Sequence, residues 1–136
     1  MPSSETALCD TGPLVALFSA GQYRREECQE AVADFRGTLT TLAVLTEAFY
    51  FLERPSEREL LWEFVIRGGL HVAELSDAEL ERMSWLMEKY ADLPMDFADA
   101  SLVTLSERLK LARVLTLDRH FRVYRPRHAA SFEIFP

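Results

Sequence analysis

The sequence has few of the residues from which disulfide frameworks and zinc sites are built. It contains two cysteines, Cys9 and Cys28, and three histidines, and their spacing resembles no zinc-binding pattern, so we exclude zinc. Two cysteines do not make a disulfide framework, and we expect both to be reduced, buried thiols.

Long apolar runs are also missing. No run approaches the roughly 18 to 20 residues of a membrane-spanning helix. The opening stretch, MPSSETALCD, has neither the basic region nor the long apolar region of a secretory signal. We therefore expect a soluble, cytoplasmic protein without a membrane partner.

The composition is that of an ordinary globular protein. Of the 136 residues, 49% are hydrophobic and 27% are charged, and we find no obvious internal repeat and no low-complexity tract. This length suits one domain with a substantial core. We expect residues 1–136 to form that single domain.

The formal net charge of −7 argues at first against a nucleic-acid partner. Its distribution is uneven, however, because residues 106–128 contain seven basic and two acidic residues. Such a basic stripe can bind phosphates, or it can simply be the solvated face of a helix. On charge alone we favour the solvated face.

Short β-rich runs alternate with helical patterns along the chain. We predict strands at 6–10, 38–41, 70–75, 113–118 and 132–135, with the last at an edge of the sheet, and helices at 11–20, 22–35, 42–53, 56–67, 76–90 and 95–109. Ser56 with Glu59 and Ser76 with Glu79 have the spacing of a capping box. Alternation of this kind predicts an α/β fold with a mainly parallel sheet of about five strands flanked by helices.

Three acidic residues are expected at one edge of that sheet. Asp10 closes the first predicted strand and Asp118 closes the fourth, and ligands of parallel sheets bind beyond the carboxyl ends of the strands. Glu47 lies within the apolar stretch TTLAVLTEAFYFLE, after the second strand. A glutamate in such surroundings needs either a wet stripe or a cation.

The stretch LPMDFADASLV adds two more carboxylates, Asp96 and Asp99, which share a helix face near the start of a predicted helix. Each acid also has a structural explanation. Asp96 fits a helix N-cap, which we favour for it, with Asp99 as the third-position acid. Asp10 would cap the next helix, Asp118 would begin a turn, and Glu47 would pair with an arginine.

Several carboxylates in one half-buried cleft repel one another by roughly 4 kcal/mol per pair at about 4 Å and an effective dielectric constant near 20. They must bind protons or a cation. A set of oxygen ligands without histidine or cysteine suits Mg²⁺ or Mn²⁺. A hydrated Mg²⁺ in turn suits phosphate chemistry, because it lowers the pKa of a bound water and stabilises charge on phosphate oxygens.

Four acidic segments of the chain resemble the four acidic motifs of PIN domains, in the same order: LCDTGPLVAL, LTEAF, DFADASLV and VLTLDRHF. The similarity extends over essentially the whole chain and is greatest to the VapC-like toxins of prokaryotic toxin–antitoxin systems. The sequence D-A-S-L-V, followed after a helix by T-L-D-R-H-F, is its most specific part. The resemblance implies a compact Rossmann-like fold and a ribonuclease that depends on Mg²⁺ or Mn²⁺.

The resemblance also implies roles for particular residues. The catalytic, metal-binding quartet would be Asp10, Glu47, Asp99 and Asp118, with Asp96 as an accessory ligand and Glu47 as a ligand or a base. Thr11 and Thr116 would be neighbouring hydroxyls, Arg119 and His120 would be the residues most able to reach substrate, and the basic residues from Arg108 to Arg127 would bind the flanking RNA backbone. By analogy, the products would carry a 5′-phosphate and a 3′-hydroxyl. Family members commonly form homodimers and are silenced by a separately encoded antitoxin.

Three other interpretations compete with a ribonuclease. The D-T-G of CDTG also occurs in aspartic proteases, but those are built almost wholly of strands. A receiver domain would need a pair of acids after the first strand and a lysine after a late one, and this sequence has neither. A catalytically idle PIN-like module that binds RNA or protein is the remaining alternative, and the intact acidic quartet counts against it.

Overall fold

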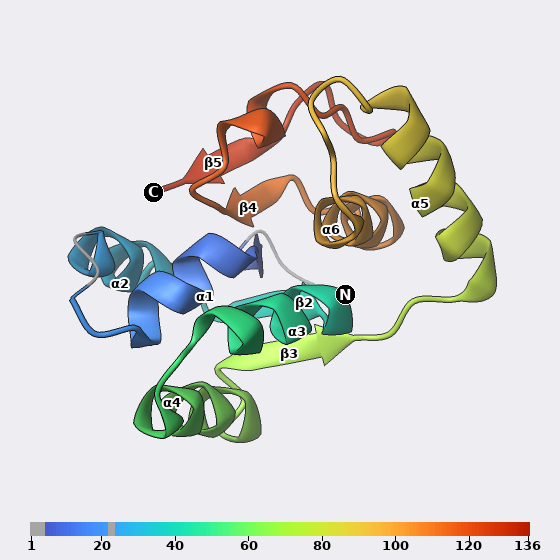
Figure 1. Cartoon of the computed structure of the whole chain (residues 1–136). Coiled ribbons are helices and arrows are strands. Elements are labelled where there is room, and N and C mark those ends of the chain that lie inside the picture. The colour runs from blue at the N-terminus through green and yellow to red at the C-terminus, as the bar shows by residue number, and fades with distance from the viewer. Residues whose placement is uncertain (1–4, 22–23) are drawn as a thin grey trace.

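A five-stranded parallel sheet lies at the centre of the computed structural model, which describes residues 5–21 and 24–136 (Figure 1). The strands are β1 (Thr6–Cys9), β2 (Gly37–Thr41), β3 (Leu70–Ala73), β4 (Arg113–Leu115) and β5 (Glu133–Phe135). They lie in the order β3-β2-β1-β4-β5, and every neighbouring pair is parallel. The predicted parallel α/β fold is confirmed, as is the position of the last strand at an edge.

The strand order reverses between β1 and β4: the chain adds β2 and β3 on one side of β1, and β4 and β5 on the other. Ligands of open parallel sheets bind at this switch point. Strands β1 and β4 end level with each other, because Cys9 pairs with Leu115. The backbone N–H of Asp10 then donates a hydrogen bond to the carbonyl of Leu115 over 2.9 Å. The segments that follow β1 and β4 therefore leave the sheet side by side.

Helices cover the sheet on both faces in the described part of the chain (Figure 1). They are α1 (Thr11–Phe18), α2 (Arg25–Ala33), α3 (Leu42–Phe51), α4 (Pro55–Ile66), α5 (Asp77–Lys89), α6 (Phe97–Leu109) and a short 3-10 helix, η1 (Arg119–Arg122). Helix α6, seen end-on in Figure 1, packs on β2 and contacts both α3 and α5. It is buried along most of its length, which explains its apolar sequence.

The predicted element boundaries need several corrections. Helix α1 ends at Phe18 rather than running to 20, β3 ends at Ala73, and α2 is shorter than the predicted 22–35, whose start at 22–23 lies outside the described residues. The fourth strand ends at Leu115, so Asp118 follows it in a turn instead of closing it. That turn forms because the hydroxyl of Thr116 accepts a hydrogen bond from the backbone N–H of Asp118 over 3.0 Å.

Helix α4 begins one residue before the predicted Ser56, and its N-cap is Arg54. Pro55 is preorganised for the first helical position, and Glu57 accepts a hydrogen bond from the backbone N–H of Arg54 over 3.0 Å. The predicted box of Ser56 and Glu59 is therefore wrong. The box at the start of α5 is confirmed, since Glu79 accepts from the backbone N–H of Ser76 over 2.9 Å and Ser76 accepts in return.

The core consists mainly of leucines from the sheet and from the inner helix faces. Cys9 and Cys28 are both buried and free, as expected. Within the described ranges, no helix combines the length and the apolar character needed to cross a membrane.

Candidate active site

Asp10 lies directly after β1 and is the N-cap residue of α1, with only 6% of its surface exposed. Its Oδ2 atom accepts a hydrogen bond from the hydroxyl of Thr116 over 2.8 Å. The backbone N–H of Thr11 also donates to this carboxylate. These two bonds fix the carboxylate of Asp10 at the edge of the sheet.

Asp118 is connected to Asp10 through Thr116. The Thr116 hydroxyl donates to Asp10 and accepts from the backbone N–H of Asp118, so one buried side chain positions both acids. The Oδ1 atom of Asp118 accepts from the backbone N–H of His120 over 2.9 Å and lies 3.3 Å from its Nδ1 atom. Thr116 therefore lies between Asp10 and Asp118, and its role at a catalytic site stays a prediction.

Asp96 and Asp99 begin α6 with a reciprocal capping box. The carboxylate of Asp96 accepts from the backbone N–H of Asp99 over 2.8 Å, and Asp99 accepts in return from the N–H of Asp96 over 3.2 Å. Asp96 is exposed, whereas Asp99 is buried and its Oδ2 atom also accepts from the hydroxyl of Tyr124 over 3.4 Å. Asp96 is thus the N-cap that we favoured, and its role as an accessory ligand stays a prediction.

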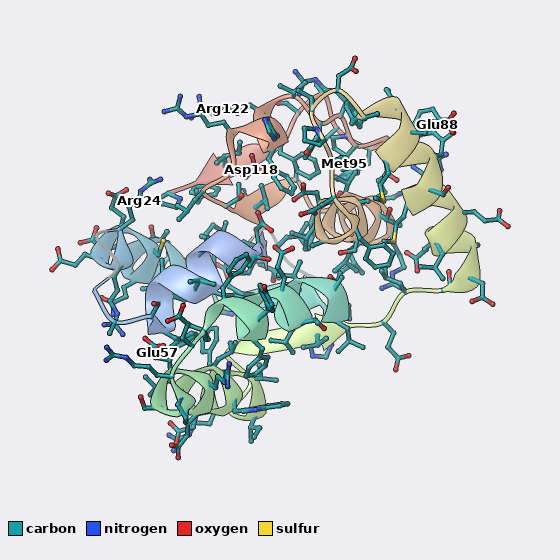
Figure 2. All side chains as sticks on the ribbon, viewed as in Figure 1. Arg24, Glu57, Glu88, Met95, Asp118 and Arg122 are labelled. Carbon is teal, nitrogen blue, oxygen red and sulfur yellow. The ribbon has the colours of Figure 1, made fainter. Side chains whose placement is uncertain are left out.

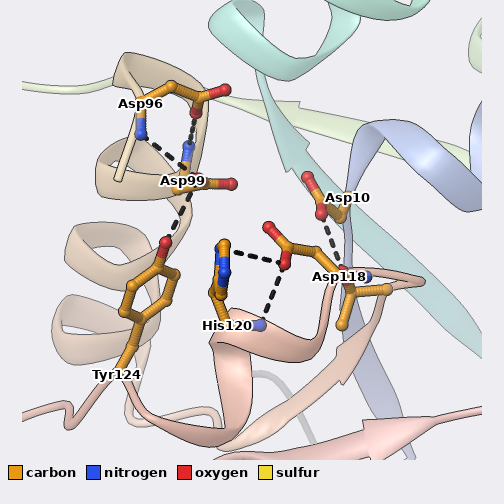
Figure 3. Close-up of polar contacts among 7 residues, drawn as sticks. Asp10, Asp96, Asp99, Asp118, His120 and Tyr124 are labelled. Atoms are coloured by element: carbon orange, nitrogen blue, oxygen red, sulfur yellow. Dashed lines mark hydrogen bonds and ion pairs between the residues drawn. The ribbon is translucent and has the colours of Figure 1, made fainter. Parts of the chain in front are cut away.

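The acids meet at one cleft of about 680 Å³, although they come from distant parts of the sequence. Figure 3 shows the carboxylates of Asp10, Asp99 and Asp118 directed into a shared space, with Asp96 on the outer side of Asp99. Glu47 lines the same cleft from α3 and is half-buried, without a hydrogen bond or ion pair within residues 5–21 and 24–136. Because this side of α3 faces the solvent in the cleft, a glutamate can occur in an otherwise apolar helix.

The cleft is strongly negative. Besides the five predicted acids, Glu53 and Glu57 line it, and Arg54 is its one basic residue among those described. Burial, together with the charges of Asp118 and Asp96, raises the pKa of Asp10 to about 6, despite the hydrogen bonds from Thr116 and Thr11. Burial also raises the pKa of Asp99, with further contributions from the charges of Asp10 and Asp96. The site therefore favours protons or a cation.

The donor set fits a hard divalent cation, because every ligand candidate is a carboxylate oxygen. Within the described residues, however, no group of three acidic, histidine or cysteine side chains lies close enough together to hold a metal ion by direct contact. This arrangement agrees with Mg²⁺ chemistry, since Mg²⁺ usually retains several waters and binds one or two carboxylates. The five predicted ligands do not form one coordination sphere by themselves.

The other predicted neighbours are found in different surroundings. Thr11 lines the cleft and is buried, and its hydroxyl has no hydrogen-bond partner in the described part of the chain. Arg119 is exposed at the start of η1, directly after Asp118. Both positions are compatible with contact to a ligand in the cleft.

The predicted basic stripe is divided by the fold. Arg119 and Arg122 lie on η1 near Asp118, and Figure 2 shows Arg122 pointing outward from the molecule. In contrast, Arg108 lies at the far end of α6, where it forms an ion pair of 3.2 Å with Glu79. The segment as a whole therefore does not form one continuous surface beside the cleft.

Sequence reasoning missed two features of the site. Tyr124 is fully buried and donates to Asp99, and Glu57 accepts a 2.7 Å hydrogen bond from the backbone N–H of Ala20 on the cleft wall. Pro55 is a local signal for the first helical position of α4, which makes Glu57 the third residue and hence the acid of the capping box. No local signal pointed to Tyr124, because its contact joins the segment after η1 to Asp99 at the start of α6.

The comparison with known families agrees with this geometry. The family model described as PIN domain matches residues 7–125, which is most of the chain. This chain belongs to the PIN domain family.

Individual relatives within and near this family are toxins and ribonucleases. Ribonuclease VapC26 of Mycobacterium tuberculosis is 30% identical over 137 residues, which cover 95% of this chain and 99% of the relative. VapC20 of Mycobacterium tuberculosis, a solved structure described as a Sarcin-Ricin loop cleaving toxin, is 16% identical with a TM-score of 0.79, covering 91% of this chain and 98% of its own. A chain of a toxin–antitoxin complex from Klebsiella pneumoniae is 19% identical with a TM-score of 0.65, covering 82% and 86%. The two solved structures confirm the PIN-type fold.

Proposed function

We propose that this PIN-domain protein is an endoribonuclease of the VapC toxin type that hydrolyses RNA phosphodiester bonds with Mg²⁺ or Mn²⁺. The observation that supports it most is the meeting of Asp10, Asp99 and Asp118 in one negative cleft, from three separate elements. The full-length similarity to a ribonuclease supports the substrate class.

We assign the binding of a hydrated metal ion to Asp10, Asp99 and Asp118, which would hold it directly or through its waters. Burial and the charges of neighbouring carboxylates raise the pKa of Asp10 and of Asp99, and a divalent cation would relieve the repulsion. When bound, such an ion would lower the pKa of a water and offset charge on the phosphate oxygens.

The remaining roles belong to this chain's own residues. We assign to Glu47 the acceptance of a proton from the attacking water, because it lines the cleft without another partner among the described residues. Attack forms a bond from the water oxygen to phosphorus and breaks the bond to the 3′ oxygen, which takes up a proton. Thr116 keeps Asp10 and Asp118 oriented, and Arg119 and His120 bind phosphate oxygens beside the cleft.

Partners follow from the same proposal. A separately encoded antitoxin would block the cleft, and an RNA substrate makes the cytoplasm the site of action. We also propose a homodimer, supported by exposed apolar side chains on α3 and α4, which are Leu42, Tyr50, Phe51, Leu60, Trp62 and Ile66. Faces of this kind commonly mark protein interfaces.

Cleavage of a mixed RNA pool by the purified protein tests the proposed function. We expect cleavage with Mn²⁺, none with EDTA, and a large loss of rate in Asp99→Asn, while Arg67→Gln, an exposed charge change on α4, cuts at the wild-type rate. An idle binding module would bind RNA without cutting it under any metal condition. That outcome, or equal rates for wild type and Asp99→Asn, would overturn the proposal.

A further inference from the structure

A second cavity, of about 670 Å³, lies at the opposite end of α6 from the cleft. The cleft contains Asp99 at the start of this helix, whereas the second cavity is lined by Thr104, Arg108 and Lys110 towards and beyond its end. Side chains of α5 and the segment Arg127–His128 line the rest of it.

Positive charge predominates in the second cavity, although the whole chain has a net charge of −7. Its two carboxylates are already engaged by cations. Arg82 donates two hydrogen bonds, of 2.8 and 2.9 Å, to Glu107, and Arg108 forms an ion pair with Glu79. Burial would raise the pKa of Glu107, but the hydrogen bonds from Arg82 and from the backbone of Arg127 hold it below its usual value.

Two further basic side chains of the second cavity could bind a ligand. The side chains of Lys110 and Arg127 line the second cavity, and within the described residues neither side chain hydrogen-bonds to a carboxylate. Lys110 ends α6 and has a left-handed backbone conformation, with φ of 55°. The cavity therefore presents the charge of Lys110 to a ligand, together with that of Arg127, which also helps to lower the pKa of Glu107.

Buried polar atoms without a hydrogen-bond partner occur at both the cleft and the second cavity. In the described part of the chain, three buried side-chain nitrogen or oxygen atoms lack a hydrogen bond. One of them, the hydroxyl of Thr11, lines the cleft, and the other two, Oγ1 of Thr104 and Nδ1 of His128, belong to residues that line the second cavity. Thr104 is only 3% exposed. Buried polar groups are rarely left unpaired, so a ligand or ordered water is expected there.

The chemistry of these atoms restricts the ligand. The Nε2 atom of His128 lies 2.8 Å from the carbonyl oxygen of Leu111 and must carry a proton, so Nδ1 of the neutral ring is an acceptor. The hydroxyl of Thr104 donates and accepts, and Lys110 and Arg127 only donate. A group with both acceptor oxygens and a hydroxyl donor satisfies this set.

We propose that the second cavity binds a ribose-phosphate unit of the RNA substrate, away from the bond that is cleaved. The phosphate accepts from Lys110 and Arg127, and the 2′-hydroxyl, which DNA lacks, satisfies Thr104 and His128. The proposal rests on the proposed ribonuclease function and adds a binding site to it.

The distance between the cleft and the second cavity sets the length of RNA that can occupy both. The 13 residues of α6 span roughly 20 Å, since an α-helix rises about 1.5 Å per residue. Stacked nucleotides advance about 3.4 Å each along one strand, so about six nucleotides separate the cleft from the second cavity. The segment after Asp118 connects the cleft, through Asp118, with the second cavity, through Arg127 and His128, and it also contains the exposed Arg119 and Arg122.

The test compares a double variant, Lys110→Gln with Arg127→Gln, with a control that removes the same charge elsewhere. Arg36→Gln with Arg67→Gln is suitable, because both arginines are highly exposed, with 85% and 79% of their side-chain surface accessible. All proteins carry Glu47→Gln, which removes the proposed proton acceptor but leaves the proposed metal ligands, and Mn²⁺ is present throughout. Thermal melting verifies that each variant is folded. Fluorescence anisotropy then measures binding of a 12-nucleotide RNA, a 4-nucleotide RNA and the 12-nucleotide DNA at several salt concentrations.

We expect the cavity variant to bind the long RNA more weakly and with a salt slope shallower by about 0.7, the value for one phosphate contact with a single strand. The cavity variant should bind the short RNA as before, and the control variant should show neither the weaker binding of the long RNA nor the shallower salt slope. The cavity variant should also lose less affinity for the long DNA than for the long RNA. Unchanged binding of the long RNA, or an equal loss in the control variant, would overturn the proposal. So would a result in which inorganic phosphate raises the melting temperature through Lys110 and Arg127 while RNA binding is unaffected, since the cavity would then serve a small phosphorylated ligand.

Failure of the second site is distinguishable from failure of the proposed function. If the wild-type protein cuts RNA with Mn²⁺ but the cavity variant binds the long RNA normally, only the second site is wrong. If the wild-type protein cuts no RNA with any divalent ion, the proposed function itself is wrong.

Discussion

At the scale of single residues, Thr116 determines how two of the acids are held. Its buried hydroxyl donates to Asp10 and accepts from the backbone of Asp118, so both acids depend on one oxygen atom. Groups that orient metal ligands in this way typically change metal affinity or activity by about 10- to 100-fold when they are removed.

We therefore expect Thr116→Val to weaken Mn²⁺ binding and slow RNA cleavage by about 10- to 100-fold. Thr38→Val is the matched control, because Thr38 is a buried threonine that hydrogen-bonds to the carbonyl of Gly69, between β2 and β3. Thr38→Val should lose about 1 kcal/mol of stability, the usual value for one hydrogen bond, and Thr116→Val about 2 kcal/mol, because it loses two. Equal Mn²⁺ affinities of the two variants, measured by calorimetric titration, would contradict the role given to Thr116.

The raised pKa values make the stability of the metal-free protein depend on pH. The pKa of Asp10 is about 6 in the folded protein and about 4 in an unfolded chain, and that of Asp99 is also raised. At these two groups the folded protein binds protons more tightly than the unfolded chain, so their contribution to stability is greatest below about pH 4 and is lost as the pH rises through the folded value.

For Asp10 alone, we expect this loss to reach about 3 kcal/mol by neutral pH, from 1.36 kcal/mol per pKa unit. Urea unfolding in EDTA at several pH values measures it. Asp10→Asn should lack this part of the fall, and Mn²⁺ should restore stability to the wild-type protein near pH 7. A wild-type curve parallel to that of Asp10→Asn between pH 4 and 7 would show that the pKa of Asp10 is not raised in the folded protein.

At the scale of elements, the two acids at the start of α6 have different proposed roles, one structural and one in metal binding. Asp96 caps the helix and Asp99 faces the cleft. We expect Asp96→Asn, which retains the cap, to keep stability and Mn²⁺ affinity close to wild type, and Asp96→Ala to lose about 1 kcal/mol of stability. If Asp96→Asn reduced Mn²⁺ affinity as strongly as Asp99→Asn does, Asp96 would be a ligand and not only a cap.

Elements with strong local signals could be predicted from the sequence, and contacts between elements could not. Alternation and capping patterns predicted all five strands, the order of helices and the acids near the carboxyl edge. The mistaken cap at Ser56 arose because Pro55 moves the first helical position one residue earlier. The hydrogen bond between Thr41 and Ser101, 2.7 Å long, and the one from Tyr124 to Asp99 join distant segments, which local patterns do not encode.

At the scale of the whole molecule, charge is separated between the two ends of α6. The cleft is lined by carboxylates and repels RNA until cations neutralise them, whereas the second cavity and η1 present basic side chains. A bound divalent ion would thus be needed both for chemistry and for admission of the phosphate backbone to the cleft. The formal charge of −7 hides this arrangement, and the sequence-based basic stripe described only part of it.

The central claim is that Asp10, Asp99 and Asp118 together bind a divalent cation at the edge of the sheet. A calorimetric titration of Mn²⁺ into the metal-free protein tests it most directly. The account predicts saturable binding that is largely lost in Asp99→Asn and unchanged in Arg67→Gln. Absence of binding to the wild-type protein, or the same affinity in Asp99→Asn, would contradict it.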